Sequence, residues 1–162
     1  RNKNEFPDFT LKSTEPNFVI DYKVGSKTGF NKDVVIERKN SANDLGTINS
    51  WPDKIKKFSD NIFFVFVIYS FSGKENKIKI DEIQIRPFYN FIGVNSSGIL
   101  SFRAKDGNLR PINFIDKPRL LSLREFTIAL FKTGIYRSKR LIKQHTGLVK
   151  EYKNLLAQEL AK

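Results

Sequence analysis

Cysteine is absent from this chain of 162 residues, and histidine occurs only once. Without cysteine there can be no disulfide, no thiolate zinc site and no cysteine nucleophile, and one histidine cannot form a histidine-based metal cluster. Any metal ion must therefore be held by oxygen ligands. Methionine is also absent and the chain begins at Arg1, so we expect that N-terminal elements of the translated protein are missing from this sequence.

Long hydrophobic runs are missing as well. The longest, IFFVFVIY at 62–69, is far shorter than the roughly 20 apolar residues of a membrane helix, so we expect no membrane association. The stretch GSKTG at 25–29 lacks the Walker spacing of a phosphate-binding loop. We therefore expect no nucleotide cofactor.

Acidic residues are outnumbered, because 17 Asp and Glu stand against 29 Lys and Arg, which gives a net charge of +12. This surplus favours a polyanionic partner, with nucleic acid as the first candidate, and a merely basic soluble protein is the alternative. The surplus is concentrated in 135–153, where we expect four side chains to contact DNA phosphates: Arg137, Lys139, Arg140 and Lys143. A solvated helix face is the alternative for this segment.

Hydrophobic residues make up 40% of the chain and include 15 Phe, which is typical of a globular protein with a substantial core. The length suits one domain, residues 1–162. Within it we predict a core of strands and one helix in 1–73, a β extension in 74–118 and C-terminal helices in 119–162.

The first half of the chain reads as strands followed by a helix. FPDFTL at 6–11 and NFVIDYKV at 17–24 are separated by the turn-like KSTEP and predict a hairpin. DVVIERK at 33–39, after the turn-rich GSKTGFNK, predicts a third antiparallel strand. A loop with a short helix around Ile55 and Phe58 comes next, and IFFVFVIYSF then predicts a central strand covered on both faces. This order predicts an α/β (α+β) domain with a mixed central sheet flanked by helices.

The second half predicts further strands and then helices. The strands are KIKIDEIQI, YNFIGVN, ILSFRA and LRPINF, all within 77–115. Ser122 is placed to cap a helix that we expect to end at Gly134, with a second helix from about Ser138 to Lys162.

Each strand of the predicted hairpin carries an aspartate in an apolar setting. Side chains two apart in a strand share a face, so Asp21 and Lys23 project together and Asp8 can lie across from them. Buried carboxylates are costly without compensation, and two of them can hold Mg²⁺, which prefers oxygen ligands. With a lysine to orient water, this constellation suits metal-assisted phosphodiester hydrolysis.

Pro7-Asp8 followed by Asp21-Tyr22-Lys23 resembles the PD-(D/E)xK signature of restriction endonucleases and related nucleases. PDFTL, EPN at 15–17 and ID-x-K at 20–23 are more narrowly similar to the EcoRV-like active-site hairpin. The close likeness covers about residues 6–24. It implies a restriction-endonuclease-like core, with Asp8 and Asp21 as metal ligands and Lys23 as the catalytic lysine.

By this resemblance the chain is expected to be a single nuclease domain, a Mg²⁺-dependent type II restriction endonuclease in which Mn²⁺ can replace Mg²⁺. The expected partner is double-stranded DNA, the expected assembly a homodimer and the expected location the cytoplasm of a prokaryote. Two alternatives stay open. One is a structure-specific or repair nuclease of the junction-resolvase kind, and the other is a non-catalytic basic DNA-binding module.

A rival site assignment lies downstream. Glu37 and Lys39 also share one face of a predicted strand, so Asp21 could be the first metal ligand and Glu37 the second, with Lys39 as the catalytic lysine. The ERK triplet followed by Asp44 faintly resembles structure-specific nucleases of the ERCC type. Both assignments share Asp21, and all five candidate residues can surround one site.

Overall fold

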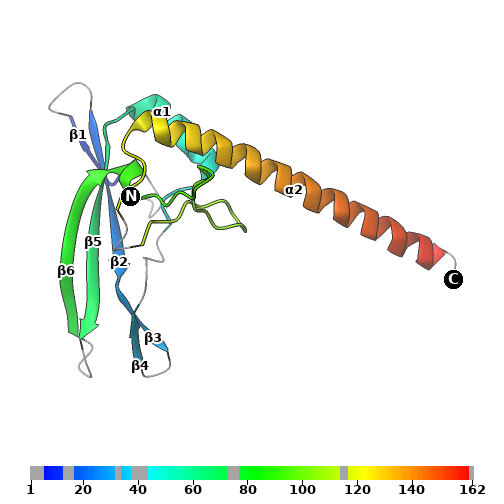
Figure 1. The fold of residues 1–162 in the computed structure, drawn as a ribbon, viewed down its shortest axis with the longest axis horizontal. Helices are drawn as coiled ribbons and strands as arrows, with labels where there is room; N and C mark the ends of the chain where they lie inside the picture. The colour runs from blue at the N-terminus through cyan, green and yellow to red at the C-terminus, as the bar shows by residue number, and fades with distance from the viewer. Residues whose placement is uncertain are drawn as a thin grey trace.

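A computed structural model describes residues 6–12, 17–31, 34–37, 44–72, 77–113 and 117–160. Its main element is a four-stranded sheet in the order β1-β2-β5-β6 (Figure 1). The strands are β1 (Phe9–Leu11), β2 (Phe18–Ser26), β5 (Ile62–Ser72) and β6 (Lys77–Pro87). β2 is antiparallel to β1 and parallel to β5, and β5 is antiparallel to β6. The sheet is therefore mixed, as predicted.

The parallel pair of β2 and β5 requires a crossover, because a tight turn joins only antiparallel strands. The crossover holds β3 (Thr28–Asn31), β4 (Val34–Glu37), the 3-10 helix η1 (Ile48–Ser50) and α1 (Trp51–Phe58). The predicted hairpin is confirmed as β1 and β2, but the third strand is not their neighbour. β4 pairs instead with β3, in a segment predicted as a turn, whereas β2 pairs with β1 over Phe18–Ile20 and with β5 along most of its length.

One face of the sheet carries the core. Buried side chains alternate along β5 at Ile62, Phe64, Phe66 and Ile68. The prediction that β5 is covered on both faces is confirmed in part, because Val65 on the other face is buried whereas Phe63 and Val67 beside it are half-buried. On the other face, neighbouring strands expose four large apolar side chains, namely Tyr22, Val24, Ile83 and Ile85. The helices thus pack on one side and leave the other side open.

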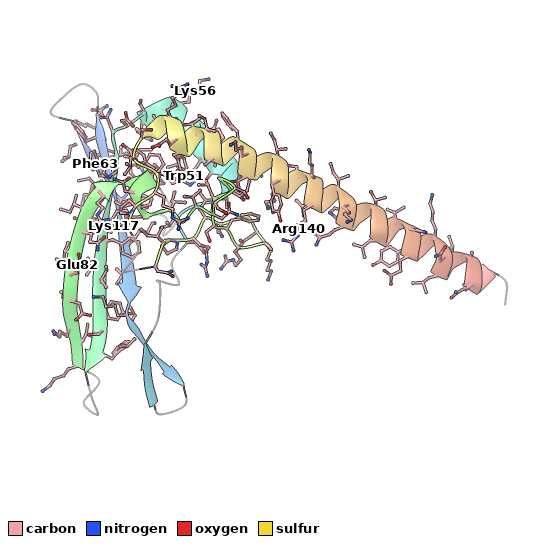
Figure 2. The ribbon with its side chains drawn as sticks, viewed as in Figure 1. Trp51, Lys56, Phe63, Glu82, Lys117 and Arg140 are labelled. Atoms are coloured by element: carbon pink, nitrogen blue, oxygen red, sulfur yellow. The ribbon has the colours of Figure 1, made fainter. Side chains whose placement is uncertain are left out.

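Trp51, the first residue of α1, is at the centre of the core. It is fully buried, stacks on Phe88 with ring centroids 4.3 Å apart, and meets Phe126 edge-on at 5.5 Å. Its indole Nε1 donates a hydrogen bond to the carbonyl of Leu45 at 3.0 Å. Figure 2 shows Trp51 near the junction of the sheet, α1 and the start of the long C-terminal helix. This packing fixes where α1 begins.

Residues 88–113 differ from the prediction. The expected strands after β6 are replaced by the 3-10 helix η2 (Phe88–Phe91) and by isolated bridges such as Val94 with Leu100 and Phe102 with Leu109. Residues 114–115 of the last predicted strand lie outside the described residues. Residues 88–113 are held by packing and by isolated backbone hydrogen bonds, because their short apolar runs are not paired with a long strand.

The C-terminal segment forms one helix, α2 (Leu123–Leu160), of 38 residues. Ser122 caps it as predicted, since its Oγ accepts a hydrogen bond from the backbone N–H of Glu125, whose carboxylate in turn accepts one from the N–H of Leu121. The predicted end at Gly134 is wrong. Gly134 has no positive φ, and Thr133 before it is buried and donates to the carbonyl of Ala129, so the helix continues.

Beyond the body of the molecule, α2 projects as a single rod (Figure 1). Among the described residues, no helix is both long enough and apolar enough to span a membrane.

Candidate active site

The two hairpin aspartates are brought together by strand register. Phe9 of β1 is paired with Ile20 of β2, so Asp8, one residue before β1, stands opposite Asp21. The backbone N–H of Tyr22 donates a hydrogen bond of 2.7 Å to Oδ2 of Asp8. This bond ties the loop before β1 to β2 and holds the Asp8 carboxylate at the edge of the same face as Asp21.

Asp21 and Lys23 lie on the covered face of β2, as the alternation predicts. Asp21 is only 7% exposed, whereas Tyr22 between them is 47% exposed on the open face. The Nζ atom of Lys23 lies 2.5 Å from Oδ2 of Asp21 and 5.5 Å from the centre of the Phe64 ring. The pair therefore combines a buried carboxylate with a partly buried ammonium.

Burial raises the pKa of the Asp21 carboxyl above its ordinary value. The hydrogen bond and the positive charge of Lys23 oppose this rise, and the adjacent Asp8 carboxyl adds to it. One lysine thus does not fully compensate for two neighbouring carboxylates. An additional positive charge in the cleft would favour the ionised form of Asp21.

These three residues line a cleft of about 590 Å³. Its other walls come from Phe6, from the segment 44–47, from Lys54 on α1 and from Asn108. The segment 44–47 turns sharply at Gly46, whose φ of +88° favours glycine. The cleft therefore joins three parts of the chain that are far apart in sequence.

Asp44, at the rim of the cleft, is already engaged by basic side chains. Its Oδ1 accepts a hydrogen bond of 2.6 Å from Arg110, and its Oδ2 accepts one of 2.8 Å from Arg103. Asn108 adds a third contact at 3.3 Å. Asp44 therefore anchors the 103–110 turn to the cleft.

Sequence reasoning missed Lys54. It is partly buried, and its Nζ lies 3.8 Å from the centre of the Phe6 ring and 4.8 Å from that of Trp51. Burial lowers the pKa of Lys54 to about 8; the negative charge of Asp21 counteracts this decrease and the positive charge of Lys23 adds to it. A signal was present, because Lys54 lies three residues after Trp51 and one before Ile55, on the apolar side of a short helix.

The structure does not bring the backbone of Glu37 to this cleft. Glu37 pairs with Thr28, seven residues beyond Asp21, which corresponds to on the order of 20 Å of extended chain. In Figure 1, β3 and β4 lie beyond the end of β2 that is remote from β1. Lys39 lies outside the described residues.

The donor set of the cleft fits a hard divalent cation. Asp8 and Asp21 provide converging carboxylate oxygens, and the incomplete compensation of Asp21 favours an added positive charge. Within the described ranges, no group of three or more histidine or acidic side chains converges on one point. Two carboxylates are compatible with Mg²⁺, which is commonly held by one or two carboxylates together with water and substrate phosphate.

The predicted DNA-contacting residues lie along the middle of α2. Arg140 and Tyr136 line a separate groove of about 900 Å³, together with Lys117, Arg119 and the loops around Asn95. Figure 2 shows Arg140 on α2 where the helix leaves the body. The sequence does not indicate that Lys117 and Arg119 belong to this groove, because their proximity to α2 depends on the fold.

Three further basic side chains of α2 differ in their surroundings. Lys139 and Lys143 are exposed. Arg137 packs against the turn at Gly107, where an added Cβ would lie only 2.9 Å from its Nε. Arg137 thus contributes to holding α2 against the 103–107 turn.

No family model matches this chain, and no curated protein matches it in sequence. Among solved structures, the chain is similar to the NlaIV restriction endonuclease, with a TM-score of 0.55 and 13% sequence identity. The match covers 74% of this chain and 48% of that chain, so this chain spans about half the length of its structural neighbour. The likeness shows a restriction-endonuclease-like α+β fold, which confirms the predicted fold class.

Proposed function

We propose that this chain is a Mg²⁺-dependent endonuclease that hydrolyses phosphodiester bonds of double-stranded DNA, as a type II restriction endonuclease. The observation that carries the proposal is the convergence of Asp8, Asp21 and Lys23 in one cleft of this fold. One fold can host many functions, so the function follows from the residues of the site. The net charge of +12 supports a polyanionic substrate.

In this proposal Asp8 and Asp21 hold the metal ion, with Mn²⁺ able to replace Mg²⁺. When bound, the ion supplies positive charge that activates a water molecule and stabilises the phosphoryl oxygens. Lys23 orients the attacking water and offsets charge on the phosphate. The water oxygen bonds to phosphorus, one bridging P–O bond breaks, and the departing oxygen takes up a proton.

The alternative triad of Asp21, Glu37 and Lys39 is less well supported. The pairing of Glu37 with Thr28 keeps its backbone away from Asp21, whereas Asp8 is opposite Asp21 by register. We therefore propose Asp8, Asp21 and Lys23 as the active residues.

We propose that the substrate duplex also contacts α2. The exposed Lys139 and Lys143 and the groove-lining Arg140 supply positive charge that suits phosphate contacts. A homodimer belongs to the same proposal, because two-fold symmetry of the protein suits a palindromic site.

The test is incubation of the purified protein with plasmid DNA and Mg²⁺. Discrete fragments whose ends map to the same short sequence in different plasmids would support a site-specific endonuclease. Cleavage that follows branched or damaged DNA instead of a duplex sequence would favour the repair-nuclease alternative. Binding without cleavage under all divalent ions would overturn the nuclease proposal in favour of a binding module.

A further inference from the structure

Lys54 lines the cleft and lies on α1, next to the part of that helix that is packed into the core. It is one turn along α1 from Trp51, which is fully buried, stacked on Phe88 and hydrogen-bonded to the carbonyl of Leu45. The ammonium contacts the faces of the Phe6 and Trp51 rings, 3.8 and 4.8 Å from their centres. These contacts restrict its position, because a cation on a ring face is held by the quadrupole of the ring.

Unlike Lys23, Lys54 makes no ion pair with a carboxylate among the residues that the structure describes. Among the described residues, its charge is compensated by ring faces and by the more distant Asp21. A partly buried ammonium without a counter-ion costs stability in the free protein. Its charge is therefore available to an anion that enters the cleft.

Gly46 contributes a wall without a side chain next to the ammonium, in a cleft of about 590 Å³. At Gly46 an added Cβ would lie 3.3 Å from Nζ of Lys54 and 3.2 Å from the indole nitrogen of Trp51. Because Gly46 has no side chain, it does not crowd the ammonium of Lys54. Asp21 and Lys23 border the same cleft, so an anion here would be beside the proposed metal ligands.

We propose that Lys54 is a second catalytic lysine, whose ammonium binds a non-bridging oxygen of the phosphodiester that is cleaved. This inference rests on the proposed nuclease function. Two carboxylates in the cleft repel a phosphate, and Lys54 adds a second positive charge beside that of Lys23, which is shared with Asp21. Charge develops on the non-bridging oxygens during phosphoryl transfer, so a fixed ammonium there acts most strongly in the transition state.

The experiment compares Lys54→Met, which keeps the aliphatic stem, with Lys54→Arg, which keeps the charge. Lys56→Met is the matched control, since it removes one charge from the exposed side of the same helix (Figure 2). Single-turnover cleavage at saturating enzyme reports the chemical step. Equilibrium binding of the same DNA in metal-free buffer and the melting temperature are measured in parallel.

We expect Lys54→Met to lower the single-turnover rate by roughly 10²–10³ without lowering the melting temperature. We expect metal-free DNA binding to weaken by about tenfold, the equivalent of one charge-assisted hydrogen bond. Lys54→Arg should recover most of the rate, and Lys56→Met should behave as the wild type. Cleavage by Lys54→Met at the wild-type rate, or a Lys54→Arg as impaired as Lys54→Met, would overturn this inference alone. An inactive wild type would overturn the proposed function itself.

Discussion

The ammonium of Lys23 and the carboxylate of Asp21 lie 2.5 Å apart on the covered face of β2. They are separated by one residue whose side chain points to the opposite face, so the contact follows from the geometry of a single strand. In the free protein this ion pair partly compensates the buried Asp21. In the proposed function a divalent cation would bind the same carboxylate that Lys23 contacts, so metal binding would act directly on this ion pair.

Replacing Asp21 with Asn should abolish cleavage, because either site assignment places Asp21 on the metal. DNA binding should be retained or strengthened, since a negative charge near the phosphate is removed. Mg²⁺ should raise the melting temperature of the wild type, as a ligand that binds only the folded state does, and should leave the variant unchanged. A variant that cuts at the wild-type rate would contradict the metal site.

The two lysine assignments predict opposite results. If Lys23 acts at the attacking water, Lys23→Ala should lower the single-turnover rate by at least roughly 10²–10³, and Lys39→Ala should cause little loss at saturating enzyme. A lysine that only contacts phosphate weakens binding, which more enzyme overcomes. The reverse order of effects would reject the hairpin site and support the Glu37 assignment.

The basic middle of α2 is tested by salt. If it contacts phosphates, the logarithm of the DNA binding constant should fall linearly with the logarithm of salt concentration, with a slope of about −0.9 per phosphate neutralised. Charge reversal at Arg140 and Lys143 should flatten this slope by about 0.9 for each lost contact. The same reversal at the exposed Lys56 and Lys57 of α1 is the control. An unchanged slope in the α2 variant would identify that face as merely solvated.

Gly134→Ala should increase the free energy of unfolding by roughly 0.5–1 kcal/mol. The reason is that Gly134 lies inside a helix and an added Cβ would meet only Ile48, at an ordinary distance of 3.9 Å. Gly107→Ala should instead be destabilising, because its φ is +76° and the new Cβ would lie 2.9 Å from Nε of Arg137. Urea unfolding measures both. Destabilisation by Gly134→Ala would indicate that the helix ends there after all.

The stability of the metal-free protein should depend on pH through Lys54. Its pKa is lowered to about 8 in the folded state from the ordinary 10.5, so the unfolded state binds more protons between these values. The charged Lys54 therefore destabilises the folded state fully below about pH 8. This penalty decreases as the pH rises and is absent above about pH 10.5. Lys54→Met should be more stable than the wild type at pH 7, and the difference should shrink towards pH 10. Urea unfolding at both pH values, with Lys56→Met as control, measures the effect; a constant difference would reject it.

Much of the candidate site was predictable because it is local. The alternation of side chains in one strand places Asp21 beside Lys23, and a hairpin register places Asp8 opposite Asp21. Likewise, the cap of α2 at Ser122 depends on residues three apart in the sequence. Such features require only short-range geometry, so the pattern of residue types was enough.

Other features could not be predicted, because they depend on contacts between distant segments. Lys54 reaches the cleft only because Trp51 packs into the core and β2 pairs in parallel with β5. Gly134 resembles a helix end by its residue type, yet burial of Thr133 beneath the 93–113 segment, where it accepts a hydrogen bond of 2.8 Å from the N–H of Leu100, favours continuation.

The sequence by itself thus determined the hairpin, its two aspartates and lysine, the basic surplus and the mixed α+β class. The tertiary structure decided which strand pairs with β2, where β4 goes, and which side chains complete the cleft. The physical reason is that local backbone preferences are weak and are overridden when burial of large apolar side chains such as Trp51 and Phe64 favours another arrangement.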